Sequence, residues 1–162
     1  MEIRLRNEND DASEISNVYE ESWKYAYKGI IPQSFLDSIP KGKWASKIDK
    51  MGCLVADDNG KIVGTAGFCG SRWEKYKEYG EIVSIYFIPD YIGKGYGKML
   101  IEACIDELRK SGYEKVLLWV LEENSRARRF YEKNGFVVNG DFLDDTIDGK
   151  NVREIMYVKN IA

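Results

Sequence analysis

The 162-residue chain contains no histidine. This absence excludes Ser-His-Asp and Cys-His catalytic triads, zinc sites with histidine ligands, and an imidazole general base. If the protein is an enzyme, its proton transfers must depend on carboxylates, phenols, lysine, thiols or water.

Cysteine and long apolar runs are also scarce. The three cysteines, Cys53, Cys69 and Cys104, are widely spaced and form no C-x-x-C motif, which argues against a disulfide framework and favours a reducing compartment. The longest strongly apolar run covers only residues 116–121, and the N-terminal sequence MEIRLRNEND has no apolar segment typical of a signal peptide. We therefore expect a soluble cytoplasmic protein with no membrane association.

The chain has no excess of positive charge. It carries 24 Lys and Arg against 27 Asp and Glu, a net charge of −3, so a broad nucleic-acid-binding face is not expected. Hydrophobic residues make up 44% of the sequence, enough for a globular core. Because no repeat or Pro/Ser-rich linker interrupts the chain, we predict a single domain spanning residues 1–162.

Hydrophobic periodicity predicts strands and helices in mixed order. Strands are predicted at 3–5, 53–56, 61–68, 81–88, 115–121, 136–138 and 152–158, and helices at 12–25, 95–110 and from 124 to 135. Residues 27–43 look irregular or only briefly helical, and 44–50 could add another turn or two. Asn59-Gly60 is a hairpin signal. The pattern indicates an α/β (α+β) sandwich with helices covering a mostly antiparallel sheet.

Three alternating glycines, Gly93, Gly95 and Gly97, stand between a predicted strand and a predicted helix. Such a turn lets backbone N–H groups and the helix N-terminus converge on a phosphate or pyrophosphate. A P-loop is excluded, because Ile92 and Met99 occupy positions that need glycine and Ser/Thr. The G-x-G-x-G spacing also fails the dinucleotide-binding pattern, which disfavours an enzyme that binds ATP or NAD here.

Two motifs together resemble the GNAT superfamily of N-acetyltransferases, which transfer an acetyl group from acetyl-CoA to an amine. Residues 92–97, Ile-Gly-Lys-Gly-Tyr-Gly, match that family's pyrophosphate loop except at the first position, where Ile92 replaces Gln or Arg. Residues 124–136 are similar to its second signature, Asn-x-x-Ala-x-x-(Phe/Leu)-Tyr-x-x-x-Gly-Phe. The resemblance covers roughly residues 53–136.

The resemblance implies a GNAT-like sheet whose strands splay apart at the CoA site, no metal, and a defined set of residues around acetyl-CoA. The implied cofactor-binding residues are Ile85, Tyr86, Phe87, Ile88, Ile92, Gly93, Lys94, Gly95, Tyr96, Gly97, Lys98, Asn124, Ala127, Phe130, Tyr131 and Lys133. Each also has an ordinary structural interpretation: Asn124 is a good helix N-cap and Phe130 a core residue. Arg126, Arg128 and Arg129 would ordinarily form a solvated helix face.

The resemblance also assigns the chemistry to Tyr131 and Glu81. Tyr131 would lie beside the sulfur and donate a hydrogen bond or proton to the departing thiolate, since a phenol and a thiol differ by only about 1.5 pK units. Glu81 matches the position of the base in the histone-acetylating branch, although an ordinary glutamate lies roughly six units below an amine. The alternative for Glu81 is a carboxylate that only orients substrate or ends a strand. A backbone N–H near Phe87 would stabilise the oxyanion, and the amine would attack directly in a ternary complex.

Aromatic and acidic residues outside the motifs suggest the acceptor. Trp23, Tyr27 and Trp73 are candidate substrate-binding residues, and Asp144 and Asp145 would suit a cationic amine. The acceptor pocket is expected to draw on residues 23–31, Trp44, 68–79 and 142–147. The segment 23–32 also resembles a bacterial subgroup that includes polyamine acetyltransferases.

Other functions stay open at this stage: a non-catalytic acyl-CoA-binding regulatory module, or an enzyme that acetylates protein N-termini or lysines. Residues 152–158 could pair across a homodimer interface.

Overall fold

The computed structural model describes residues 1–162 and consists of one seven-stranded sheet with four α-helices. The elements in chain order are β1 (Glu2–Leu5), α1 (Ala12–Ala26), α2 (Gln33–Asp37), β2 (Gly52–Asp58), β3 (Lys61–Gly70), β4 (Gly80–Phe87), α3 (Tyr96–Lys110), β5 (Lys115–Leu121), α4 (Ser125–Lys133), β6 (Val137–Ile147) and β7 (Lys150–Asn160). Short 3₁₀ helices occur at Ala45–Lys50, Glu74–Tyr76 and Pro89–Tyr91.

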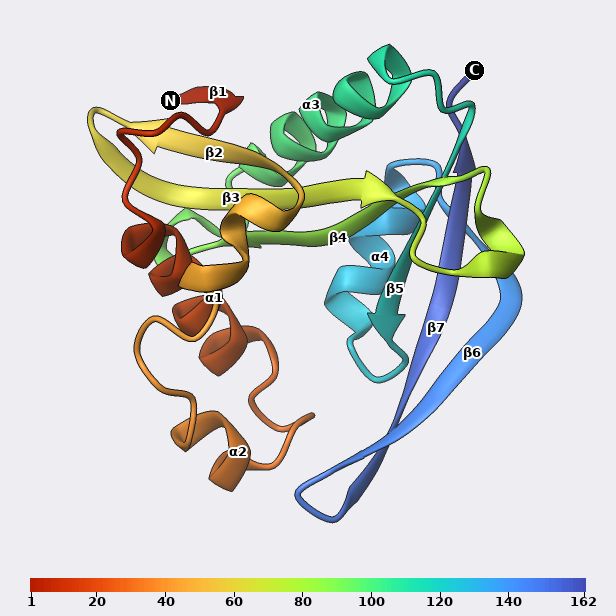
Figure 1. Cartoon of the computed structure of the whole chain (residues 1–162). Coiled ribbons are helices and arrows are strands. Elements are labelled where there is room, and N and C mark those ends of the chain that lie inside the picture. The colour runs from red at the N-terminus through yellow and green to blue at the C-terminus, as the bar shows by residue number, and fades with distance from the viewer.

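The strand order is β1-β2-β3-β4-β5-β7-β6, and every neighbouring pair except β4–β5 is antiparallel. The predicted mixed, mostly antiparallel sheet is therefore confirmed. In Figure 1, α3 lies above the β2–β4 part of the sheet and α1 and α2 lie below it. Ile15 of α1, Leu100 of α3 and Leu118 of β5 belong to one buried cluster, so helices and strands share a continuous core.

The two central strands, β4 and β5, pair over a very short distance. Their parallel register contains only Gly80 opposite Val116 and Glu81 opposite Leu117. Beyond these pairs the strands separate, and α4 lies beside the region where they diverge (Figure 1). The register of β3 on β4 also skips Val83, because Gly67 pairs with Ser84 while Phe68 pairs with Ile82. This bulge bends β4 where the separation begins. The predicted splaying of the strands is therefore present.

The C-terminal hairpin is longer than predicted. The sequence patterns indicate a strand over 136–138 and leave 142–147 outside regular structure, whereas β6 runs from Val137 to Ile147. The turn joining β6 to β7 has positive φ at Asp148 (45°) and Gly149 (82°), the Asp-Gly form of a two-residue hairpin turn. The Asn59-Gly60 turn between β2 and β3 is confirmed in the same way, with φ values of 53° and 92°.

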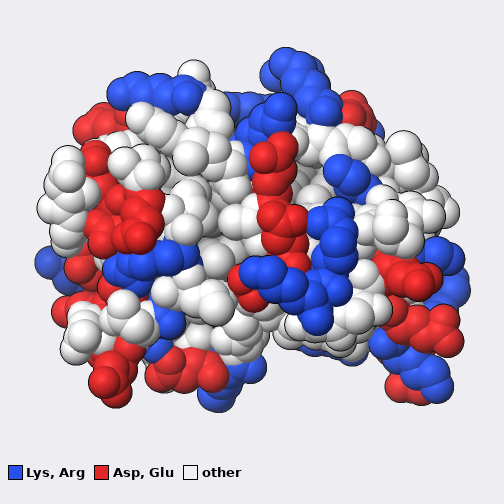
Figure 2. All heavy atoms as spheres, turned by 90° about the horizontal axis from the view of Figure 1, so that it is seen from above, with Lys and Arg blue, Asp and Glu red and all other residues white.

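The surface carries charges of both signs. Figure 2 shows acidic and basic side chains interspersed over the face seen from above, with no continuous basic area. Along α3, Arg109 pairs with Asp106 and Lys110 with Glu107, one turn apart. None of the helices has the combination of length and apolar character that crossing a bilayer requires.

A buried ion pair joins β1 to the start of α1 and generates a prediction on stability. Asp10, which is 8% exposed, accepts bonds from Arg4 Nη1 at 2.7 Å and Nη2 at 2.9 Å and from the backbone N–H of Asn7. Its hydrogen bonds to Arg4 lower the pKa of Asp10 below the ordinary value. A depressed folded-state pKa stabilises the fold above the unfolded-state pKa of about 3.9, and this contribution is lost as pH falls through the folded-state value.

We therefore expect Asp10→Asn to lower the free energy of unfolding at pH 7 by about 2 kcal/mol. The difference from wild type should shrink progressively below about pH 4. Urea unfolding at several pH values measures it, with Asp106→Asn in the exposed pair on α3 as the control. An equal loss at pH 7 and at pH 2.5 would contradict the electrostatic origin.

Candidate active site

A cavity of about 1350 Å³ opens where β4 and β5 separate. Its wall is built from the end of α1, Arg72 and Trp73, Ile82–Phe87 of β4, the glycine turn, the end of β5, α4, and the facing parts of β6 and β7. Because β4 has no partner on its β5 side beyond Glu81, backbone groups on that side are free to bind a ligand.

One end of the cavity is shaped to bind an anion. Gly93 and Gly95 have φ values of 78° and 86°, which residues with a Cβ rarely adopt. Gly95 is the N-cap of α3 and supplies no side-chain cap, so the first N–H groups of that helix remain available. Gly97 serves a different purpose: a Cβ there would approach the Phe130 ring to 3.1 Å. Gly97 therefore allows α3 and α4 to pack closely.

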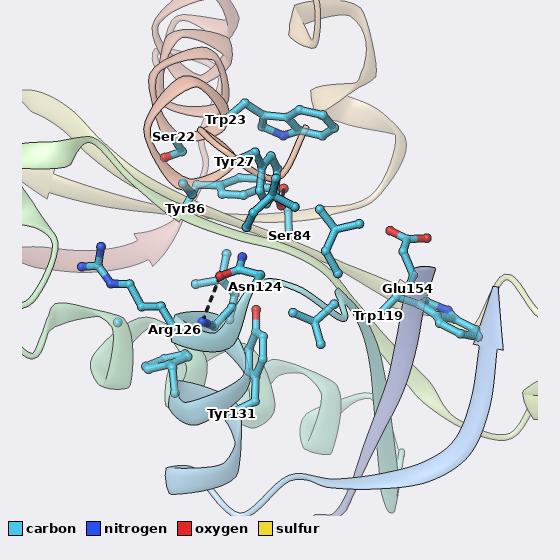
Figure 3. A pocket seen from close by; sticks show the side chains of 18 of the residues that line it. Ser22, Trp23, Tyr27, Ser84, Tyr86, Trp119, Asn124, Arg126, Tyr131 and Glu154 are labelled. Atoms are coloured by element: carbon cyan, nitrogen blue, oxygen red, sulfur yellow. Dashed lines mark hydrogen bonds between the residues drawn. The ribbon is translucent and has the colours of Figure 1, made fainter. Parts of the chain in front are cut away.

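Helix α4 adds positive charge to the same part of the cavity. Asn124 caps α4 by accepting a hydrogen bond from the backbone N–H of Ala127 at 3.2 Å (Figure 3). Arg126, Arg129 and Lys133 line the cavity, as does Lys98 of α3. Cationic side chains and uncapped helix N–H groups together suit a polyphosphate.

Arg128 differs from these cations and does not line the cavity. Its guanidinium donates hydrogen bonds to the Tyr157 hydroxyl at 3.1 Å and to the backbone carbonyl of Glu122 at 3.1 Å. Arg128 therefore links α4 to β7. The expectation that Arg128 belongs to a solvated helix face is wrong, because its guanidinium bonds to other parts of the protein.

Tyr131 of α4 presents its hydroxyl to the cavity. Figure 3 shows the hydroxyl directed away from α4, toward the side on which Asn124 and Tyr86 lie. The hydroxyl makes no hydrogen bond within the protein, although the residue lines the cavity. Burial raises the pKa of Tyr131 well above its ordinary value. The phenol therefore stays protonated at neutral pH and is a hydrogen-bond donor without a partner.

Aromatic side chains enclose the other part of the cavity. Tyr27, just after α1, packs edge-on against Trp23 with ring centroids 4.8 Å apart, and its hydroxyl lies 3.3 Å from that of Tyr86. Trp73 and Trp119 pack together with centroids 5.3 Å apart. These faces suit the methylene groups of an acceptor, and they also attract a cation.

Two carboxylates face this aromatic region, Glu154 of β7 and Asp145 of β6. Glu154 lies opposite Leu121 of β5 and Leu143 of β6, and Asp145 lies opposite Val152. Opposed residues in a sheet point to the same face, so this register directs Glu154, Asp145 and their partners toward the cavity. In Figure 3, Glu154 and Trp119 lie at one end of the view and Arg126 lies at the other.

Most of the predicted site residues line this cavity. They are Trp23, Tyr27, Trp73, Ile85, Tyr86, Phe87, Ile92, Gly93, Gly95, Gly97, Lys98, Asn124, Ala127, Phe130, Tyr131 and Lys133. Among the predicted residues that do not line it are these five: Glu81, Ile88, Lys94, Tyr96 and Trp44.

Glu81 is the most consequential of the five. It is fully buried, and its carboxylate accepts hydrogen bonds from Arg72, from the backbone N–H and Nε at 3.1 Å each and from Nη2 at 2.5 Å. Its position explains this, because Glu81 still pairs with Leu117, before β4 and β5 separate. In the structure Glu81 is therefore the ion-pair partner of Arg72, and its carboxylate does not line the cavity.

Of the other four, Ile88, Tyr96 and Trp44 lie in packed surroundings and Lys94 is exposed. Ile88 belongs to the core, and Tyr96 packs against Phe87 and Tyr91. Lys94 Nζ lies 5.9 Å from the centre of the Tyr91 ring, and Trp44 packs on Tyr19 and Trp23. Asp144, expected to serve a cationic acceptor, is paired with Arg153 at 2.8 Å and also does not line the cavity.

Sequence reasoning missed Glu154 and Trp119 as cavity residues, whereas Arg72 lies in the segment 68–79 that the sequence predicts for the acceptor pocket. Trp119 is an aromatic interruption in an otherwise aliphatic strand, and Glu154 interrupts the last strand with a charge. A charge in a strand whose neighbours face the core was the signal that could have identified Glu154. The antiparallel pairing of β5 with β7, which brings these two residues together, could not be read from either strand alone.

The chain belongs to the GNAT acetyltransferase family, whose family model matches residues 14–136. It is an N-acetyltransferase, and its acetyl donor is acetyl-CoA.

Its relatives include an uncharacterized N-acetyltransferase of Archaeoglobus fulgidus, 34% identical over 140 residues, which cover 81% of this chain and 89% of that protein. A spermidine N(1)-acetyltransferase of Thermoplasma acidophilum is 28% identical over 145 residues, with 85% and 90% covered. Among solved structures, the PaiA N-acetyltransferase of T. acidophilum in complex with coenzyme A superposes with a TM-score of 0.77 at 25% identity, over 99% of both chains.

The pairing of Glu81 with Arg72 predicts a defect mainly in stability. Glu81→Gln should lower the free energy of unfolding by about 2 kcal/mol, because the bonds from Arg72 lose their charge-assisted strength. Affinity for CoA, measured by calorimetry, should stay at the wild-type value. Glu74→Gln, in an exposed pair at 4.0 Å with Lys77, is the control. A variant with wild-type stability but no turnover would overturn this assignment.

Proposed function

We propose that the protein acetylates the primary amine of a small cationic acceptor, which attacks acetyl-CoA directly while both substrates are bound. The observation that carries the proposal is the arrangement of one cavity: a basic end at the α3 N-terminus, an acidic and aromatic end, and the unpartnered Tyr131 hydroxyl on its wall. A polyanionic donor and a cationic acceptor would bind at opposite ends.

The residues at the basic end fit coenzyme A. The turn at Gly93 and Gly95, with the uncapped N-terminus of α3, would hold the pyrophosphate, assisted by Lys98 and the cations of α4. Backbone groups of Ile85–Ile88 on the side of β4 that has no strand partner would bind the pantetheine amides, as the family resemblance implies.

The bound donor supplies an activated thioester, and the chain's own residues promote its aminolysis. A backbone N–H near Phe87 would stabilise the oxyanion that forms as the amine adds. Tyr131, kept protonated by burial, would donate its O–H to the sulfur as the carbon–sulfur bond breaks.

No covalent enzyme intermediate is needed. Burial raises the pKa of the Cys53, Cys69 and Cys104 thiols, which disfavours the nucleophilic thiolate.

The acidic and aromatic end supports a cationic acceptor. Arg72 is the cation whose charge lowers the pKa of Glu154, and Arg72 is already paired with Glu81. A carboxylate on the acceptor substrate would thus be repelled by Glu154 and Asp145, with no free guanidinium to bind it. An ammonium group on the acceptor would be attracted by the same two carboxylates. The spermidine acetyltransferase among the relatives agrees with this preference.

A thiol-release assay with acetyl-CoA tests the proposal. The panel should contain monoamines, diamines, triamines, amino acids and a lysine peptide, matched in chain length where possible. We expect the diamines and triamines to give the highest kcat/KM. CoA binding without amine-dependent thiol release for any acceptor would instead support a regulatory module, and a preference for the peptide would support a protein acetyltransferase.

Tyr131→Phe should lower kcat by about 100-fold, because the departing thiolate loses its proton donor. The dissociation constant of CoA should be unchanged, since the ring still fills its place. Tyr79→Phe removes a hydroxyl that lies outside the cavity and is the matched control. Unchanged turnover of Tyr131→Phe would remove this hydroxyl from the chemistry.

A further inference from the structure

Glu154 is a carboxylate on the cavity wall that has no hydrogen-bond or ion-pair partner. It is half-buried, and no side chain or backbone group donates a hydrogen bond to it or forms an ion pair with it. By contrast, Glu81 is held by Arg72, Glu123 by Lys150 and Asp144 by Arg153. A desolvated, unpaired carboxylate lowers the free energy of unfolding. Its presence on a cavity wall therefore points to a ligand that supplies the missing hydrogen-bond donor or positive charge.

A second unpartnered polar group lies on the same face of the sheet. The Trp119 indole N–H is buried and makes no hydrogen bond. Trp119 is two residues before Leu121, the residue opposite Glu154, so both side chains stand on the cavity side of the β5–β7 ladder. An unused acceptor and an unused donor beside aromatic rings would suit a group that both donates and accepts hydrogen bonds, as an uncharged amine does.

The geometry points to Glu154 as the general base that removes a proton from the acceptor's ammonium group, an inference that rests on the proposed function. The carboxylate accepts one of the three ammonium protons and later releases it to solvent. The freed nitrogen lone pair forms the carbon–nitrogen bond, and the carbon–sulfur bond breaks. A second proton passes to the departing thiolate with the help of Tyr131, and the third stays on the amide.

The charged and titratable groups around Glu154 favour this role. Burial, and next the charge of Asp145 on β6, raise the pKa of Glu154, while Arg72 opposes them. Tyr86 of β4 and Tyr27 after α1 face it as neutral phenols, because burial raises the pKa of both and the Glu154 charge raises it further. A carboxyl with a raised pKa is a better proton acceptor at neutral pH than an ordinary one. Asp145 is exposed, which keeps a route to solvent open beside Glu154.

The test compares Glu154→Gln with wild type over the pH range, using the best acceptor of the panel and its β,β-difluoro analogue. The fluorines lower the pKa of the amine toward neutrality, so much of the analogue is already uncharged. We expect kcat/KM for the ordinary acceptor to fall by about 100-fold, with loss of the acid limb that Glu154 protonation imposes on the wild-type profile. For the fluorinated acceptor the loss should be at least ten-fold smaller, because much of this amine is already present as the free base at neutral pH.

Three further measurements make the outcome decisive. Glu122→Gln, an equal charge change at an exposed site next to β5 and outside this cavity, should keep wild-type kcat. Glu154→Asp should keep the acid limb at reduced kcat, and CoA affinity and melting temperature verify that each variant is folded. A raised KM with unchanged kcat and unchanged pH profile would overturn the proposal and leave Glu154 as a cation-binding residue only. Absence of thiol release by wild type with every amine would instead refute the proposed function.

Discussion

The separation of β4 from β5 is the constraint on which the site depends, because it opens the sheet and exposes backbone that a continuous sheet would pair. The strands are held together at Glu81 and Leu117 and are apart from Ile82 onward. The ion pair between the buried Glu81 carboxylate and Arg72 lies at this vertex, and the bulge at Val83 bends β4 immediately after it. A substitution that broke the strand pairing at this vertex, rather than removing only the Glu81 charge, would move both the backbone of β4 that lines the cavity and the segment that carries Arg72 and Trp73.

The second organising feature is the division of charge along the cavity. Glycine φ values and an uncapped helix provide an anion site that needs few cationic side chains, so the chain can remain acidic overall and still bind a polyanion. The acidic end is supplied by the C-terminal hairpin, far away in sequence. With histidine absent, the groups that can exchange protons on this wall are phenols and carboxylates, and burial shifts the pKa of Tyr131 and Glu154 upward. Tyr131 thereby stays protonated and can donate a proton, and Glu154 becomes a better proton acceptor.

The features that sequence predicted well depend on short-range chemistry. The N-cap at Asn124, the Asn59-Gly60 turn and the glycine turn before α3 each depend on residues within one or two turns of chain, and all three are present. The full length of β6 does not follow from the alternation at residues 136–138 alone; the Asp148-Gly149 turn is the local signal that extends the hairpin. The charge of Glu154 in a strand marks it as unusual, but the side chains that it faces could not be predicted, since they depend on the register of β7 between β5 and β6, which is set by tertiary packing.

The two glutamates illustrate why a motif position does not by itself define a chemical role. A carboxylate whose oxygens are occupied by a guanidinium and a backbone N–H has little capacity left to accept a proton from a substrate, however well its position matches a family pattern. A carboxylate that is desolvated and unpaired is held in a high-energy charged state, which a bound ammonium relieves or a proton neutralises. In this chain Arg72 makes the difference: by pairing with Glu81 it stabilises the vertex of the sheet, and it leaves Glu154 without a guanidinium of its own. Arg72 thus determines which carboxylate a substrate can reach, because it pairs with Glu81 and leaves Glu154 unpaired.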